Sequence, residues 1–144
     1  MSIYHNIMIP TDFSAVSDFA AARVREFAGE GVQVTVLHVV DYIPPSYAAA
    51  ELPDSYATGE VIVKNARTQL NEWIERVGLS EAQTVLATGP AKAEIVSRSK
   101  ALGIDLLVMG THGEHGIARL LGSTTRAVLH DAECDVLVVS AAPR

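Results

Sequence analysis

A glycine-rich stretch, GTHGEHGIARLLGSTTRAV at residues 110–128, combines residue types suited to holding phosphate groups. Its glycines stand at 110, 113, 116 and 122, and the hydroxyl residues Ser123 and Thr124 follow the last of them. Glycine lets a backbone approach an anion closely, and the first turn of a helix carries unpaired N–H groups and a partial positive charge. The stretch predicts either a phosphate site at a helix N-terminus or a plain connection between a strand and a helix.

The spacing of these residues differs from two common phosphate-binding motifs. A P-loop requires a lysine directly after its last glycine, and here Ser123 follows Gly122, with Arg119 and Arg126 as the nearby cations. A Rossmann dinucleotide fingerprint lies after the first strand, where this chain has PTDFS without any glycine. We therefore exclude both motifs.

A carboxylate follows the first apolar run, in the sequence IPTDFS. At the end of a strand, Asp12 could accept hydrogen bonds from ribose hydroxyls or hold a metal ion beside phosphates. Alternatively, Asp12 or Ser14 could cap the helix that follows. The two roles are compatible with each other.

The elements that position these residues alternate along the chain. Runs rich in Val, Ile and Leu predict strands over residues 6–10, 32–40, 82–89, 105–110 and 135–141. Helical spacing predicts helices over residues 14–28, 59–77, 91–102 and 123–130. Strict alternation predicts a Rossmann-like α/β fold, a doubly wound five-stranded parallel sheet with helices on both faces, in one domain over residues 1–144. Ligands of such sheets bind beyond the carboxyl ends of the strands.

Some local details follow from the same patterns. The run at 82–89 is weaker and more alternating than the others, which favours an edge strand. Ser14 is expected to cap the first helix, and Gly103 to end the third. The apolar residues of the first helix are expected to share one buried face: Val16, Phe19, Ala20, Val24 and Phe27.

Composition and charge exclude several classes of partner. The net charge is -6 without any basic run, which argues against binding to a nucleic-acid backbone. No apolar run approaches the ~20 residues of a membrane span. The start of the chain, MSIYHNIMIPTDFS, lacks the features of a signal peptide, and one cysteine, Cys134, excludes an intrachain disulfide. We expect a cytoplasmic protein.

Three stretches and their order resemble the universal stress protein (UspA-type) family over essentially the whole chain. They are NIMIPTDFSAVSDFAAARVREFA, VTVLHVV and GIDLLVMGTHGEHGIARLLGSTTRAVLHDAECDVLVV, of which the last is the most specific. The resemblance implies a homodimeric stress-response protein that binds ATP or another adenine nucleotide and responds to it as a regulator.

By matching position, the resemblance also implies a set of site residues. Asp12 would meet the ribose, where it could also hold Mg²⁺, and Val39 or Val40 would flank the adenine. The phosphates would contact Gly110, Gly113, Gly122, Ser123 and Thr124. The same cleft would be lined by Pro10, Thr11, Met109, Thr111 and His112.

One departure from the family pattern concerns the glycine loop. Nucleotide-binding members have nine residues between the second glycine and the Gly-Ser/Thr pair, whereas residues 114–121 here number eight. One residue fewer removes up to ~3.5 Å of reach. The shorter loop favours one alternative, a nucleotide-free interaction module. A separate alternative is a weak Mg²⁺-dependent ATPase, with Asp12 holding Mg²⁺ and His112 near the γ-phosphate.

Other residues admit two interpretations each. His38 is expected to be a hydrogen-bonded structural residue, and Cys134 a small packing residue rather than a nucleophile. The trio His112, Glu114 and His115 falls short of the ligand set of a metal site. The tyrosines of the 41–58 connection could close over an adenine or contact a second subunit: Tyr42, Tyr47 and Tyr56.

The last apolar run, residues 135–141, predicts a homodimer interface. A strand at a sheet edge exposes unpaired backbone groups, and antiparallel pairing with a second copy would satisfy them around a two-fold axis. Cover by the chain's own loops is the alternative.

Overall fold

The structure is a computed structural model that describes residues 3–41, 59–112 and 121–140. Within these ranges, five parallel strands form one sheet: β1 (Asn6–Pro10), β2 (Gln33–Val40), β3 (Gln83–Thr88), β4 (Leu106–Gly110) and β5 (Asp135–Val139). The connecting helices are α1 (Ala15–Phe27), α2 (Gly59–Arg76), α3 (Ala91–Ala101) and α4 (Ser123–Asp131). The predicted α/β fold is confirmed.

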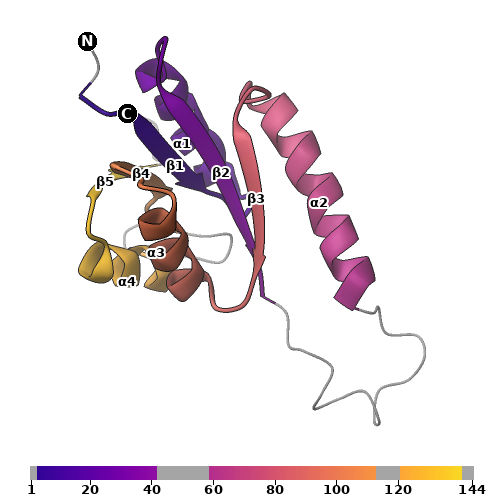
Figure 1. The fold of residues 1–144 in the computed structure, drawn as a ribbon. Coiled ribbons are helices and arrows are strands. Elements are labelled where there is room, and N and C mark those ends of the chain that lie inside the picture. The colour runs from indigo at the N-terminus through magenta and orange to yellow at the C-terminus, as the bar shows by residue number, and fades with distance from the viewer. Residues whose placement is uncertain (1–2, 42–58, 113–120, 141–144) are drawn as a thin grey trace.

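The strand order is β3-β2-β1-β4-β5, so β3 and β5 are the edge strands. The weak 82–89 run lies at an edge, as its alternation predicted. Figure 1 shows α3 and α4 together on the near face of the sheet and α1 behind it. The order reverses direction between β1 and β4, and this is where a doubly wound sheet opens a crevice at its carboxyl edge.

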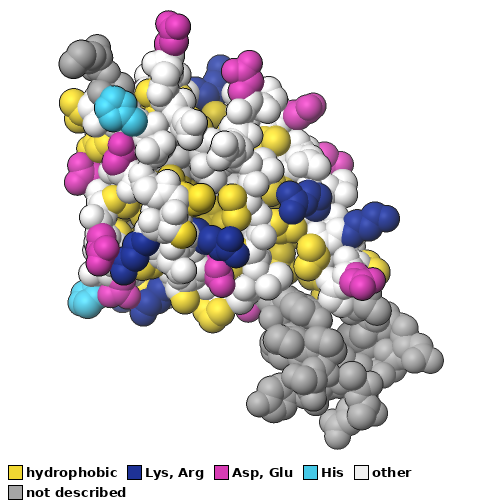
Figure 2. All heavy atoms as spheres, in the orientation of Figure 1, with side chains coloured by type: hydrophobic (Ala, Val, Ile, Leu, Met, Phe, Trp, Pro, Cys, Tyr) yellow, Lys and Arg dark blue, Asp and Glu magenta, His cyan; other side chains and the backbone are white. Residues whose placement is uncertain are grey.

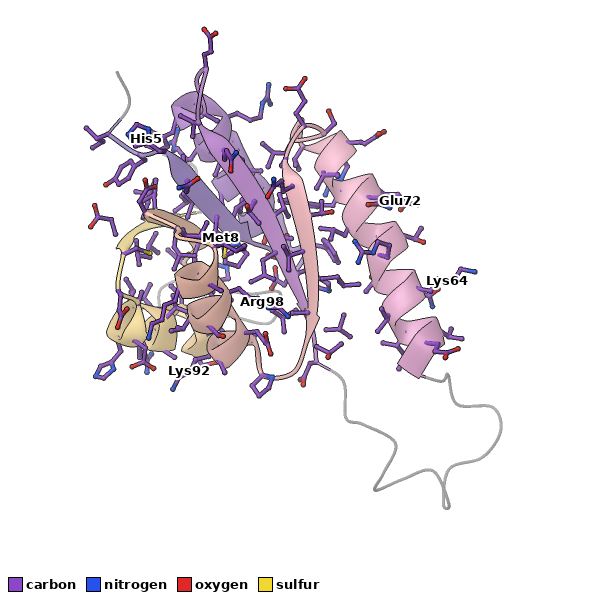
Figure 3. All side chains as sticks on the ribbon, in the orientation of Figure 1. His5, Met8, Lys64, Glu72, Lys92 and Arg98 are labelled. Carbon is purple, nitrogen blue, oxygen red and sulfur yellow. The ribbon has the colours of Figure 1, made fainter. Side chains whose placement is uncertain are left out.

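Alternate residues of the central strands pack into two separate hydrophobic cores, one on each face of the sheet. Ile7 and Ile9 are fully buried against the cluster under α1 and α2, while Met8 is fully buried against the cluster under α3 and α4. Successive side chains of a strand point to opposite faces, so a strand covered on both sides must be apolar throughout. Figure 3 shows Met8 inside the molecule, whereas Lys64 and Glu72 project from the outer side of α2.

The start of α1 and the end of α3 follow the predicted capping. The Ser14 hydroxyl accepts a hydrogen bond from the Ser17 amide at 3.4 Å and caps α1. Gly103 has a φ of +64° just after α3, and its amide donates to the Lys100 carbonyl at 3.2 Å. Such a left-handed residue is favourable for glycine because it has no Cβ.

The predicted buried face of α1 is partly wrong. Phe19 and Phe27 are 48% and 43% exposed, and the buried residues are Val16, Ser17, Ala20, Ala21 and Val24. A long-range contact sets this rotation of the helix, since Asp18 accepts hydrogen bonds from Trp73 and Arg76 of α2 at 2.9 Å each. Local apolar spacing carries no information about that contact.

Several charged side chains on the surface form ion pairs with opposite charges. Lys92 lies 3.5 Å from Asp131, and Lys100 lies 3.4 Å from Glu133. On the face drawn in Figure 2, Lys and Arg side chains lie among acidic ones. In the described part of the chain, no helix is long and apolar enough to cross a membrane.

Candidate functional site

A cavity of about 440 Å³ opens at the carboxyl edge of the sheet, beside the ends of β1, β2 and β4 and the first turns of α3 and α4. Sequence analysis predicted ten of its lining residues: Pro10, Thr11, Asp12, Val39, Met109, Gly110, His112, Gly122, Ser123 and Thr124. It missed five others: Ser17, Leu37, Ala91, Ile95 and Thr125. Segments far apart in the sequence therefore meet at the predicted place.

The carboxylate of Asp12 is exposed and lines this cavity. Its Oδ1 atom accepts a hydrogen bond from the Ser14 amide at 3.0 Å and another from the Ser17 hydroxyl at 3.0 Å. Ser14, not Asp12, is the N-cap of α1. Asp12 thus stabilises the turn that enters α1, and its carboxylate also borders the cavity.

The N-terminus of α4 forms the polar end of the cavity. Gly122 is the N-cap, the helix has no side-chain cap, and its first turn contains no acidic residue. The amides of Ser123 and Thr124 are in the first turn, where an α-helix offers no internal acceptor. Such an end carries a partial positive charge, so it is suited to an anion.

Three hydrogen bonds hold the start of α4 and the segment after β4 in place. The Gly122 amide donates to the Thr111 carbonyl at 2.7 Å, and the Thr125 hydroxyl donates to the Gly110 carbonyl at 2.8 Å. The Thr111 amide in turn donates to the Val139 carbonyl of β5 at 3.0 Å. The two ends of the glycine loop are therefore joined whatever path residues 113–120 take.

Gly110 has a packing reason to be glycine. A Cβ added to Gly110 would overlap the side chain of Val16 in α1. Gly110 therefore allows α1 to pack closely on the end of β4, in addition to bordering the cavity. The sequence pattern suggested only the second role.

The inner wall of the cavity is apolar. Leu37 of β2, Ile95 of α3 and Met109 of β4 are each at most 5% exposed and belong to the core under α3 and α4. An apolar wall facing a few polar groups is the usual arrangement of a small-molecule site.

Two predicted residues do not line the cavity. Val40 is 7% exposed and alternates with Val39, so its side chain points to the opposite face of the sheet, as that of Val36 does. Thr111 takes part through its backbone bonds, and its hydroxyl lies 3.0 Å from Nδ1 of His112. Gly113 lies outside the described residues.

Some of the lining residues that the sequence patterns did not single out share a face or a helical turn with residues that they did. Leu37 precedes Val39 by two positions in one strand, so both side chains share a face. Ser17 lies one helical turn after Ser14. Ala91 and Ile95 of α3 required knowledge of which face of the sheet α3 covers.

The surroundings of His38 and Cys134 indicate structural roles for both residues. Nδ1 of His38 lies 2.7 Å from the Thr11 carbonyl, which agrees with the expected structural role. Partial burial raises the pKa of the Cys134 thiol, so this thiol is a poor nucleophile near neutral pH.

Most residues of the possible metal-ligand pattern, and the three tyrosines of the 41–58 connection, are not described by the structure. Glu114, His115, Tyr42, Tyr47 and Tyr56 all lie outside the described residues. In the part of the chain that is described, no three His, Cys, Asp or Glu side chains are grouped to hold a metal ion.

The strand order, the helix N-terminus without a side-chain cap and the apolar wall define a class of small doubly wound proteins with a cleft at the carboxyl edge of the sheet. The model of the Universal stress protein family matches residues 3–140, and the chain belongs to that family. Universal stress protein A homolog 2 of Coxiella burnetii is 36% identical over 141 residues, which cover 96% of this chain and 97% of that protein.

Solved structures share the fold. The structure of MJ0577 of Methanocaldococcus jannaschii is similar with a TM-score of 0.76 and 27% identity, over 99% of both chains. A universal stress protein in complex with cAMP is similar with a TM-score of 0.64 and 24% identity, over 98% of this chain and 100% of that one. The universal stress protein from Archaeoglobus fulgidus in complex with dAMP is similar with a TM-score of 0.58 and 22% identity, over 95% of this chain and 98% of that one. A family protein from Arabidopsis thaliana with AMP bound is similar with a TM-score of 0.60 and 17% identity, over 94% of this chain and 91% of that one.

Proposed function

We propose that this protein binds an adenine nucleotide in the cleft and acts as a nucleotide-responsive regulator of a stress response. The observation that carries the proposal is that an apolar wall and a helix N-terminus without a side-chain cap both border one cavity of about 440 Å³. The solved relatives in complex with cAMP, dAMP and AMP support it.

The chemistry of the walls suggests how the nucleotide lies. A base is flat and largely apolar on its faces, so it would contact Val39 and the wall beside it. The ribose hydroxyls would donate to Asp12. The phosphates would lie at the first turn of α4, near Gly122, Ser123 and Thr124, with Gly110 also bordering the cavity. The proposed phosphate contacts include Gly113, which lies outside the described residues.

We propose ATP as the physiological nucleotide and the nucleotide-bound protein as the form that a partner recognises. Mg²⁺ fits only in part, because Asp12 is the one carboxylate among the described residues that line the cavity. Mg²⁺ in proteins is commonly held by one or two carboxylates together with substrate phosphates and water. A metal here would therefore depend on the bound phosphates.

We also propose that the protein is a cytoplasmic homodimer, built from one domain per chain and paired through β5. This strand is at the edge of the sheet, and its residues Val136, Leu137 and Val138 are only partly buried. Antiparallel pairing with a second copy would satisfy the outer backbone groups of β5 and cover those side chains.

Calorimetric titration with ATP and AMP tests the nucleotide proposal. We expect saturable binding to the wild type and binding at least about tenfold weaker for Asp12→Ala, a loss of ~1.4 kcal/mol. Glu72→Ala on the outer side of α2 is the matched control, since it removes an exposed carboxylate away from the cleft. Absence of binding to the wild type at millimolar nucleotide would refute the proposal and favour the nucleotide-free interaction module.

A further inference from the structure

Phe13, between Asp12 and Ser14, has an unusual backbone conformation. Its φ is +65°, and it is the one non-glycine residue with positive φ in the described ranges. The left-handed region is unfavourable for a bulky L-residue because its Cβ crowds the following carbonyl. Such a conformation persists only where surrounding contacts hold it, and it is frequent at ligand sites.

Three contacts hold Phe13 in place. Its amide donates to the Thr11 hydroxyl oxygen at 3.0 Å, and its ring centroid lies 4.2 Å from that of His38. The Trp73 ring lies beyond, at 6.3 Å from the Phe13 ring. His38 is itself anchored by Nδ1, which lies 2.7 Å from the Thr11 carbonyl. A carbonyl oxygen only accepts, so Nδ1 carries the hydrogen in this contact.

The turn has its two side chains on opposite faces of the sheet. The Phe13 ring packs against the core under α1 and α2, whereas the Asp12 carboxylate lines the cleft beside α3 and α4. The left-handed backbone at Phe13 is the change of direction between these side chains. The next amide, that of Ser14, returns to Asp12 Oδ1 at 3.0 Å.

We infer that Phe13 and His38 are positioning residues. They pack on the face of the sheet opposite the cleft and hold the turn at residues 11–14, so that the Asp12 carboxylate faces the ligand. Neither side chain lines the cleft, so both act through the turn. Their role in binding rests on the proposed function, whereas their effect on the conformation of the turn does not depend on any ligand.

Two pairs of variants test the inference. Phe13→Ala removes the ring, and Phe13→Tyr keeps it. His38→Leu removes the donor, and His38→Asn keeps one near the position of Nδ1. Phe19→Ala is the matched control, because it removes an exposed phenylalanine from the neighbouring helix α1.

The first measurement needs no nucleotide. Amide hydrogen exchange by NMR reports on the Phe13 and Ser14 amides, whose acceptors are both within the turn. We expect exchange to be about tenfold faster in Phe13→Ala and His38→Leu, and unchanged in Phe13→Tyr, His38→Asn and the control. Unchanged exchange in both disruptive variants would overturn the inference.

The second measurement is the affinity for AMP by calorimetry. We expect about five- to tenfold weaker binding in the two disruptive variants and recovery in the two conservative ones. Faster exchange with wild-type affinity would overturn the positioning role. If wild-type protein binds no AMP or ATP, the proposed function falls, and amide exchange alone decides whether Phe13 and His38 hold the turn.

Discussion

The close approach of α1 to the end of β4 leads to a quantitative prediction for Gly110→Ala. The backbone of Gly110 is not in the left-handed region, so alanine is sterically allowed there as far as its own dihedral angles are concerned. Alanine would ordinarily be favoured over glycine in a strand by about 0.5–1 kcal/mol. The added Cβ, however, would overlap a methyl group of Val16 and lie 3.0 Å from its Cβ.

The overlap has to be relieved by moving a well-packed helix, because Val16 is only 4% exposed. Overpacking of this kind typically costs about 1–3 kcal/mol, so we expect Gly110→Ala to destabilise the protein by that amount. Val16→Ala alone should cost about 1.5–2.5 kcal/mol, through lost burial and the cavity that it leaves.

The double variant separates the overlap from other effects. Without the methyl groups of Val16, the severe overlap is removed and only the tight 3.0 Å contact with its Cβ remains, so the double variant should lie within about 1 kcal/mol of Val16→Ala. Urea unfolding followed by the emission of Trp73, the single tryptophan and 2% exposed, measures all three variants. Gly29→Ala is the matched control, since nothing lies within 4 Å of its added Cβ.

Either of two results would refute this prediction. A Gly110→Ala variant as stable as the wild type would show that α1 does not pack closely on the end of β4. Additive free energies in the double variant would show that Val16 is not the obstacle. Far-ultraviolet circular dichroism would establish that each variant retains its helices, so that unfolding compares like with like.

Three further predictions concern the loop, the helix pair and the sheet edge. Inserting a leucine after Leu121 restores the nine-residue spacing and should tighten ATP binding severalfold in calorimetry; unchanged or weaker binding would show that loop length does not limit affinity. Hydrogen bonds from Arg76 and Trp73 lower the pKa of Asp18 in the folded protein. The ionised Asp18 therefore stabilises the fold fully above the unfolded pKa of about 3.9, and this contribution is lost as the pH falls through the lower folded pKa. Urea unfolding should therefore find Asp18→Asn less stable than wild type at pH 7, with the difference shrinking below pH 4, and a constant difference would contradict the pKa shift. Val138→Lys should convert a dimer to a monomer in sedimentation velocity, because it places like charges across the proposed two-fold axis; a wild-type monomer would refute pairing through β5.

Local sequence patterns predicted the elements well and their orientation less well. Each observed strand and helix lies within one or two residues of its predicted bounds where the structure describes them. The rotation of α1 was not predictable, because Phe19 and Phe27 fit an apolar stripe that the contacts of Asp18 with α2 turn away from the sheet.

The candidate site shows the same division. The sequence placed Asp12, Gly110 and Gly122 near one another because the carboxyl ends of parallel strands must meet at one edge of the sheet. It did not distinguish Val39 from Val40, since that choice depends on which face of β2 borders the cleft. Ile95 was missed because its helix is brought to the cleft only by packing.

The sequence by itself determined which segments are strands and helices, the α/β class and the edge at which the polar residues gather. These properties follow from periodicity and chain direction, which are local. Two properties were decided by the tertiary structure alone: the need for glycine at position 110 and the left-handed backbone of Phe13. Both depend on contacts with Val16 and His38, which are distant in the chain, and those contacts exist only after the helices have packed on the sheet.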